Sequence, residues 1–158
     1  MTTLVLAGQA PDAAAQLYVV FKVGDAEYAV ESSVVLQMEA FTSATAVPGT
    51  AAFIAGVMPV RGRVVPVIDL RIRFGLQAAP RTLDSRVVVG QLGDRAVALL
   101  ADSAREVLRM AASDLKPPPP MIDEGSGGFV KAIAQVGQRL IMLLDFAKVI
   151  GEEPVNVR

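Results

Sequence analysis

The stretch from Phe53 to Gly75, FIAGVMPVRGRVVPVIDLRIRFG, decides the fold of this chain. Two Val- and Ile-rich runs are joined at Arg61-Gly62, which is the pattern of two β-strands and a tight turn. Asp69 then precedes Leu70–Phe74, and Gly75 follows. Asp is a favourable N-cap and Gly a favourable helix end, so this part predicts a short helical turn. Nothing in the stretch is typical of a catalytic site.

The same arrangement of an apolar run, a turn with Gly and a second apolar run occurs four times in the chain. Gly adopts positive φ without a Cβ clash, so each turn predicts the tip of a β-hairpin. The four turns are Gly24-Asp25, Arg61-Gly62, Gly93-Asp94 and Gly137-Gln138. Four hairpins with further strands between them predict an all-β fold of two small closed sheets. Runs such as Val87–Val89 and Leu140–Leu144 suit strands that are shared between a barrel interior and an interface.

Arginines follow three of these turns, at Arg63, Arg95 and Arg139. We interpret Arg95 and Arg139 as charges that keep apolar hairpins soluble and blunt their edges. Pro66 interrupts the second strand of its hairpin and has no N–H to donate. It is therefore predicted at a sheet edge or at a bulge.

Helices are predicted to be few and short. Ser32–Glu39 begins with candidate N-cap serines and predicts two helical turns. Asp145 is the predicted cap of a helix over Phe146–Ile150. The Pro117–Pro120 run predicts a stiff, extended spacer, and Asp123–Gly128 predicts an exposed, flexible loop.

The composition argues against an enzyme. The chain has 158 residues with no His, no Cys and no Trp. This removes the commonest general base, the thiolate nucleophile and the usual zinc ligands. The glycines at 125–128 lack the spacing and the Lys of a phosphate loop. We interpret the acidic pairs Asp123-Glu124 and Glu152-Glu153 as solvated loops, and predict no catalytic residue, no cofactor and no metal.

Charge and hydropathy limit the partners. The formal net charge of −1 gives no positive field for nucleic acid, and aromatic residues are only 5% of the chain. Hydrophobic residues make up 53%, yet every apolar run is far shorter than the ~20 residues of a membrane span. We therefore predict a cytoplasmic protein without membrane insertion whose apolar surface docks other macromolecules. Its domain is predicted at 17–152, between a mobile tail at 1–16 and a C-terminal tail at 153–158.

From about Leu17 to Ile150 the chain resembles the CheW family of bacterial chemotaxis coupling proteins. The resemblance rests on segments in the family's order, which are FKVGDAEYAV, SSVVLQM, FIAGV…RG…VPVIDLR, VALLADSAREVL, LKPPPP and LLDFAKVI. It implies a fold of two interleaved five-stranded SH3-like β-barrels with a few short helices.

The resemblance also implies a function. Such proteins are non-enzymatic adaptors that bridge the cytoplasmic hairpins of methyl-accepting chemoreceptors to the regulatory domain of a CheA-type histidine kinase. That kinase domain has the same double-barrel shape, and alternation with it builds rings in membrane-associated or cytosolic receptor arrays. An adaptor of a pilus-motility system, or of another non-flagellar chemosensory system, is the alternative.

Three positions match the family's receptor-contacting groove: Val35, Gly56 and Arg61. Val35 is expected either to meet the apolar face of a receptor helix or to belong to the core. Gly56 either leaves room for close backbone approach or is a simple bulge glycine. Arg61 is expected to bind a carboxylate or carbonyl groups at the receptor junction, to staple the barrels together, or both.

Position 37 departs from the family pattern. Gln37 stands where family members commonly have Glu, and that Glu is the natural partner of the arginine that matches Arg61. An amide accepts a hydrogen bond from Arg but supplies no charge. The contact of Arg61 is therefore expected to be weaker here, or to be taken over by Glu39 or Asp69.

Overall fold

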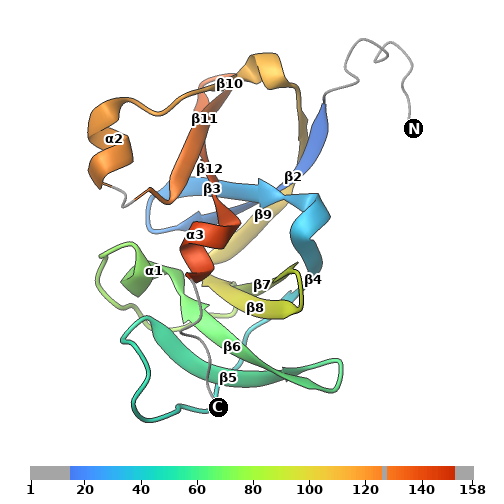
Figure 1. The fold of residues 1–158 in the computed structure, drawn as a ribbon, viewed down its shortest axis with the longest axis vertical. Helices are drawn as coiled ribbons and strands as arrows, with labels where there is room; N and C mark the ends of the chain where they lie inside the picture. Colours follow the sequence, from blue (N-terminus) through green and yellow to red (C-terminus); the bar gives the residue numbers. More distant parts are fainter. Residues whose placement is uncertain (1–14, 126–127, 152–158) are drawn as a thin grey trace.

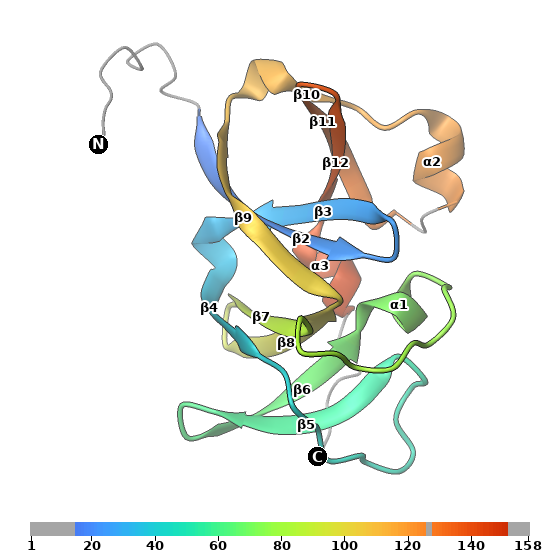
Figure 2. The ribbon, with the colours of Figure 1, turned by 180° about the vertical axis from the view of Figure 1, so that it is seen from behind.

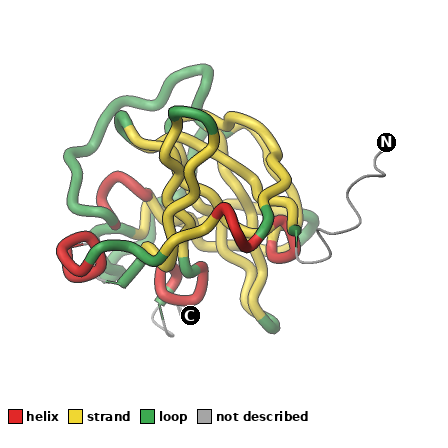
Figure 3. Tube along the Cα trace, turned by 90° about the horizontal axis from the view of Figure 1, so that it is seen from above, coloured by secondary structure: helices red, strands yellow, loops and turns green. Residues whose placement is uncertain are grey.

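The structure is a computed structural model that describes residues 15–125 and 128–151. Most of both predicted tails, and residues 126 and 127 of the predicted flexible loop, lie outside the described residues. Strands form most of the described chain, and the helices are short (Figures 1 and 3). None of the described helices is long and apolar enough to cross a membrane.

The first sheet has six strands in the order β10-β11-β12-β3-β2-β9 (Figure 1). All neighbours are antiparallel except β12 and β3, which are parallel. The outer strands β9 and β10 are joined in the sequence by a 3-10 turn, η3 (Ala112–Asp114). The strand bounds are β2 (Gln16–Val23), β3 (Ala26–Glu31), β9 (Ser103–Met110), β10 (Leu115–Lys116), β11 (Val130–Val136) and β12 (Arg139–Leu144).

The second sheet has five strands in the order β4-β7-β8-β6-β5, with only β6 and β8 parallel. After β4 the chain returns to the far edge, where Thr45 forms a β-bridge with Val57, so the sheet curls toward a barrel. Figure 2 shows β4 leading down from the first sheet into the second. The strand bounds are β4 (Val35–Ala40), β5 (Ile54–Val60), β6 (Arg63–Asp69), β7 (Arg86–Leu92) and β8 (Arg95–Ala101).

All four predicted hairpins are confirmed. Each has a two-residue turn, and the residue pairs that flank the turns are Val23 with Ala26, Val60 with Arg63, Leu92 with Arg95, and Val136 with Arg139. Pro66 pairs with Val57 of β5, while the pairing of β6 with β8 starts only at Val67. Pro66 therefore has a strand neighbour on one side only, as its missing N–H requires.

The chain consists of two repeats that exchange their first hairpins. Repeat A (residues 16–75) supplies β2–β3 to the first sheet and β4–β6 to the second, whereas repeat B (residues 86–151) supplies β7–β8 to the second sheet and β9–β12 to the first. The registers agree residue by residue. In the parallel pairs, Leu143 faces Ala29 in the first sheet, and the equivalent Val67 faces Ala98 in the second. This exchange explains why the two barrels are interleaved.

Two predicted helices are confirmed. Helix α1 (Leu70–Arg73) begins after Asp69, whose carboxylate accepts a hydrogen bond from the Arg71 N–H at 3.0 Å. Helix α3 (Phe146–Ile150) begins after Asp145 and ends at Gly151, which has a φ of 75°. Asp69 and Asp145 are equivalent positions of the two repeats, so the same cap is used twice.

Two other segment predictions are wrong in part. Ser32–Glu39 is not two helical turns but a single 3-10 turn, η2 (Ser32–Val34), followed by strand β4. In β4 exposed and half-buried residues alternate, which is the period of a strand. Helix α2 (Pro120–Gly125) occupies the end of the predicted Pro spacer and half of the predicted flexible loop. Pro120 opens it, because Pro is favourable at the first position of a helix.

The core has three clusters of buried residues. One lies inside each sheet, and the largest lies between the sheets. Val87 and Val89 point into the second barrel, while Val88 points toward the first sheet. The prediction is therefore confirmed for Val87–Val89, whereas Leu140, which begins the second predicted run, is 60% exposed.

Candidate functional site

The β5–β6 tip carries Arg61, and Figure 1 shows this hairpin extending away from the rest of the sheet. Arg61 has a φ of 52° and is the only non-glycine residue with positive φ in the described chain. Gly62 follows with a φ of 81°, so the turn is of the I′ kind that hairpins favour. Arg61 is exposed, and its side chain forms no hydrogen bond or ion pair with the described residues. A charged group is thus held outward at a cost in backbone strain.

The residues expected to pair with Arg61 have other partners in this structure. Gln37 donates a hydrogen bond from Nε2 to Glu39 Oε2 at 2.6 Å. Asp69 caps α1 and lies 3.8 Å from the guanidinium of Arg81. It also stands at the opposite end of β6 from the turn, roughly 20 Å away along the strand. The structure brings Gln37 and Glu39 together but joins neither of them to Arg61.

Gly56 is buried under the chain's own backbone. A Cβ at this position would lie 2.3 Å from the carbonyl oxygen of Thr45. The backbone φ of 145° is also one that residues with a side chain rarely adopt, so the position requires glycine. The strand register also shifts between Ile54 and Gly56, which marks a bulge. Both readings of Gly56, close approach and bulge, describe the same local geometry. The approaching backbone is the segment at Thr45 and Ala46.

Val35 opens strand β4 and pairs with Gly90 of β7. It is half-buried and packs against the cluster between the two sheets. Its neighbours Leu36 and Met38 are each 40% exposed. Val35 thus lies at the margin of the core, beside an apolar row at the surface.

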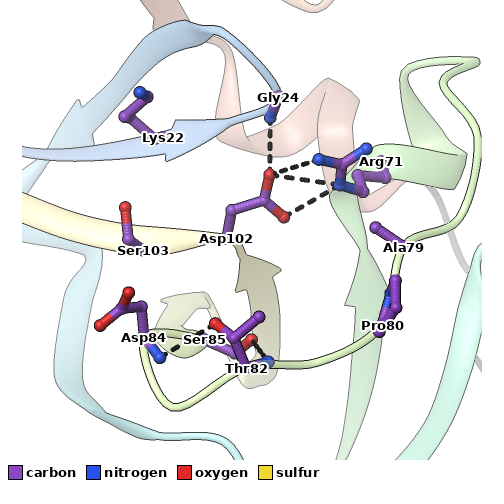
Figure 4. A pocket seen from close by; sticks show the side chains of 10 residues that line it. All are labelled: Lys22, Gly24, Arg71, Ala79, Pro80, Thr82, Asp84, Ser85, Asp102 and Ser103. Carbon is purple, nitrogen blue, oxygen red and sulfur yellow. Dashed lines mark hydrogen bonds and ion pairs between the residues drawn. The ribbon is translucent and has the colours of Figure 1, made fainter.

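A polar hollow of about 390 Å³ opens between the barrels on the side of α1. At its centre the Asp102 carboxylate accepts the Gly24 N–H at 2.7 Å and two N–H groups of Arg71 at 2.9 and 3.0 Å (Figure 4). Burial alone would raise the pKa of Asp102. The hydrogen bonds from Arg71 and Gly24 outweigh it and hold that pKa below its ordinary value. Asp102 therefore joins the β2–β3 tip of the first sheet to α1 of the second.

A second hollow, of about 170 Å³, occupies the equivalent place on the side of α3. We call it the α3-side hollow. Its lining combines the apolar side chains of Val34, Leu92, Leu144, Phe146 and Ala147 with the charged side chains of Glu31, Lys131 and Asp145. An ion pair between Lys131 and Glu31, 3.1 Å long, stands at its rim. The positions of Arg71 and Asp102 correspond here to Ala147 and Ser33, so the central ion pair is missing from this side.

The arginines beside the hairpin turns have specific acceptors, which corrects our interpretation of Arg95 and Arg139 as solubilising charges. Arg95 donates to the Gly151 carbonyl at 2.7 Å, beyond the end of α3. Arg139 bridges Glu27 and Glu106, each at 2.6 Å, and its hydrogen bond lowers the pKa of Glu27. Arg63 donates to the Asp94 carbonyl at 3.1 Å. Each of the three ties a hairpin end to another element.

Sequence reasoning also missed Arg73, which joins the two repeats. Its guanidinium lies 4.0 Å from the ring centre of Phe53 and 4.8 Å from that of Phe129. It also donates to the Val149 carbonyl at 2.8 Å. A signal was present, because Phe53 and Phe129 open two segments with the same spacing to a capping Asp and a final Gly.

Comparisons with known proteins agree with this architecture. Residues 17–153 match the CheW-like domain family. The chemotaxis protein CheW of Rhizobium meliloti (strain 1021) is 30% identical over 135 residues, which cover 85% of this chain and 87% of that protein. Protein FrzA of Myxococcus xanthus is 34% identical over 140 residues, with 85% of each chain covered.

A solved structure is also similar. The crystal structure of the scaffolding protein TtCheW from Thermoanaerobacter tengcongensis has a TM-score of 0.79 and 28% identity, and covers 85% of this chain and 91% of that chain. The expected all-β fold of two interleaved barrels is confirmed, with the two-residue strand β10 added to the first sheet. The chain belongs to the CheW-like domain family.

Proposed function

We propose that this protein is a non-enzymatic adaptor that couples chemoreceptors to a CheA-type histidine kinase in chemotaxis signalling arrays. Membership of the CheW-like family supports this, as do relatives named chemotaxis proteins and a scaffolding protein. The adaptor would work in the cytoplasm and be recruited to the arrays by its partners.

The observation that carries this proposal is the state of Arg61. Strained backbone at a non-glycine residue persists where the surroundings impose it, and such residues concentrate at functional sites. Arg61 is exposed, has a φ of 52° and has no acceptor among the described residues. A planar guanidinium in this state suits a carboxylate or backbone carbonyls supplied by a partner. The receptor hairpin is the partner we assign to it, with Val35 as a further contact. Gly56 would shape this surface from beneath, because it is covered by the backbone at Thr45 and Ala46.

The repeats suggest two docking faces for the kinase. Val64 of β6 and Leu140 of β12 are equivalent positions, and they are 73% and 60% exposed. An exposed apolar side chain at the same place of both barrels would offer two similar contacts to a partner. The regulatory domain of a CheA-type kinase, with its own double barrel, would meet one face of the adaptor at each end and so extend a ring.

The test is a pair of titrations with purified partners: a receptor cytoplasmic hairpin fragment and the regulatory domain of a CheA-type kinase from the same organism. Arg61→Ala should weaken binding to the receptor fragment by about 1.5–3 kcal/mol, the range expected for loss of a charged hydrogen bond. It should leave the kinase arm unchanged. Arg109→Ala, which removes an exposed arginine from the first sheet, is the matched control. Equal loss with both arginine variants would refute the assignment of Arg61.

Val35→Asp tests the same division of surfaces. A carboxylate at Val35 would be desolvated against a receptor helix, so receptor binding should be lost while kinase binding remains. Thermal unfolding of the variant must show that it stays folded. Loss of both partners by a folded variant would show that Val35 does not separate the two surfaces.

The similarity to protein FrzA keeps the alternative adaptor role open, because it is as extensive as the similarity to the chemotaxis proteins. In that role the fold and the contacts are the same, and the receptor belongs to a pilus-motility or other non-flagellar system. Titration against receptor fragments from each array of the organism would decide between the two.

A further inference from the structure

One wall of the polar hollow comes from the loop before β7. The residues of this loop that line the hollow are Ala79, Pro80, Thr82, Asp84 and Ser85 (Figure 4). Arg71 Nη1 also donates a hydrogen bond to the Gln77 carbonyl of the loop at 3.2 Å. In repeat A the equivalent loop precedes β2, and of it the structure describes only Ala15, which does not line the α3-side hollow.

The two loops share a register in the sequence. A shift of 69 residues relates the first hairpins of the repeats, because Gly24-Asp25 and Gly93-Asp94 form the same turn. The shift extends into the loops, where Ala10-Pro11 and Ala79-Pro80 are the same distance apart. Residues 8–15 are therefore the equivalents of residues 77–84. We call residues 8–15 the leading segment.

The two loops also enter their strands at the same place. The Ser85 carbonyl accepts the Phe41 N–H at 3.1 Å, where β7 meets the end of β4. Gln16 and Met110 are the equivalent residues, and they pair where β2 meets the end of β9. The leading segment thus departs from the first sheet as the loop before β7 departs from the second. Eight residues reach as far as ~25 Å when extended, so the α3-side hollow is within its range.

The side chains of the leading segment suit the smaller hollow. Residues 82–84, Thr-Leu-Asp, correspond to residues 13–15, which are three alanines. The α3-side hollow has a volume of about 170 Å³, against about 390 Å³ for the polar hollow. Its lining includes Leu92, which is 41% exposed. Alanine methyl groups can cover such a wall without burying a polar side chain that lacks a partner.

We infer that the leading segment lies over the α3-side hollow of its own chain and closes it, as the loop before β7 closes the polar hollow. The contact is apolar and within one chain, so it needs no second copy. This inference does not rest on the proposed coupling function, because it concerns residues other than Val35, Gly56 and Arg61.

Charge makes this closure reversible. In the loop before β7, Arg81 lies 3.8 Å from Asp69, the cap of α1. The equivalent residues are Asp12 of the leading segment and Asp145, which lines the α3-side hollow. Two carboxylates brought together repel each other. Apolar contact therefore favours the closed state while this pair opposes it, and the segment acts as a cover that opens and closes.

Thiol labelling tests the closure, because the chain has no Cys of its own. Ala147→Cys places a thiol in the α3-side hollow, at the equivalent of Arg71, which the loop before β7 contacts. Deletion of residues 2–13 should speed its reaction with a maleimide by about threefold or more, since the rate follows the fraction of molecules with an open hollow. Asp12→Asn removes the same charge but keeps the segment. It is the matched control and should not speed the reaction.

Reversal of the charge should act in the opposite direction. Asp12→Arg should slow the labelling of Ala147→Cys, because the new arginine can approach Asp145 as Arg81 approaches Asp69. A positive charge near a thiol by itself makes the thiol more reactive. Slower labelling therefore reports closure of the hollow and not a change in the chemistry of the thiol.

Val64→Cys provides a second reporter, because Val64 is 73% exposed and does not line the hollow. Its labelling rate should be the same with and without the leading segment. Equal rates for Ala147→Cys in the two proteins would overturn the inference. An equal acceleration at both reporters would overturn it as well, because the deletion would then act on the whole fold. So would labelling of Ala147→Cys that slows as the protein concentration rises, since the cover would then come from a second copy.

Discussion

The two hollows between the barrels occupy equivalent places in repeat A and repeat B, yet they are filled in opposite ways. On the α1 side an ion pair joins Arg71 and Asp102 at 2.9 Å. On the α3 side an apolar contact takes the place of this ion pair, because Phe146 packs so closely over Gly90 that a Cβ there would lie 2.6 Å from Phe146 Cζ. The same backbone registers therefore accept either kind of junction. An ion pair with hydrogen bonds holds the α1 side together, whereas close packing of a ring on a glycine holds the α3 side together.

The α3 side also differs from its counterpart in where the large side chain stands. Phe21 and Leu70 in one half correspond to Gly90 and Phe146 in the other, and all but Gly90 belong to the cluster between the sheets. The phenylalanine ring lies on strand β2 in one half, at Phe21, and on helix α3 in the other half, at Phe146. A phenylalanine ring is thus present at both junctions, but the junction with Gly90 lacks the leucine side chain that accompanies the ring in the other half.

The largest effect is expected from removing the ring on the α3 side. Phe146 is 7% exposed and lies over Gly90, so Phe146→Ala leaves a cavity that glycine cannot fill. We expect the free energy of unfolding to fall by about 3–5 kcal/mol. Urea unfolding measures this, and a loss below 1 kcal/mol would mean that the junction collapses to fill the space.

Exchanging the side chains of the two halves tests whether they are truly equivalent. Gly90→Phe alone should destabilise by about 1–3 kcal/mol or more, because the new ring overlaps Phe146. Gly90→Phe combined with Phe146→Leu copies the residues Phe21 and Leu70 of the other half. The double variant should be more stable than the sum of the single changes predicts. Additive losses in this cycle would show that the equivalence ends at the backbone.

The polar side should respond to Asp102→Asn with a smaller loss and with a pH dependence. The Asp102 side chain is 35% exposed, so solvent screening reduces the loss at neutral pH to about 1–2 kcal/mol. Its pKa is lowered in the folded protein, so its stabilisation is present above the ordinary Asp pKa of ~3.9 and is lost as the pH falls through the lowered value. The difference between the two proteins in urea should therefore shrink as the solution is acidified. A difference that stays constant would show that Asp102 acts through packing.

The smallest effect is expected at the β5–β6 turn. Arg61→Asn gives Asn-Gly, the favoured sequence of a type I′ turn, and should stabilise the protein by about 0.5 kcal/mol. The same variant should bind the receptor fragment less tightly, because the guanidinium is gone. Thermal unfolding and titration together test this. A less stable variant would show that Arg61 contributes to the fold.

Local chemistry made much of the fold predictable. The glycine turns and the caps Asp69 and Asp145 act within a few residues, and the structure confirms them. The prediction of two helical turns over Ser32–Glu39 was wrong. The serines of this segment suit a helix start, whereas its later residues alternate as those of a strand do. The prediction that Pro120 belongs to an extended spacer was wrong, because proline suits both an extended run and the first turn of a helix.

The candidate site was less predictable, because its contacts join distant parts of the chain. Asp102 meets Gly24 and Arg71 only through the pairing of strands from both repeats. The acceptors of Arg95 and Arg139 are likewise far away in the sequence. No spacing along one segment reveals such partners. The roles of Val35, Gly56 and Arg61 toward a receptor remain predictions.

The parallel pairing of β3 with β12 has a consequence for synthesis in the cell. Ala29 cannot reach its neighbour until Leu143 has left the ribosome. At the usual rate of translation this wait lasts on the order of ten seconds. During that time the β3 edge of the hairpin stays unpaired, and its β2 edge is unpaired until β9 has been synthesised. The unpaired edge exposes the nascent chain to premature association, and we expect its yield to depend on chaperones more than its size suggests.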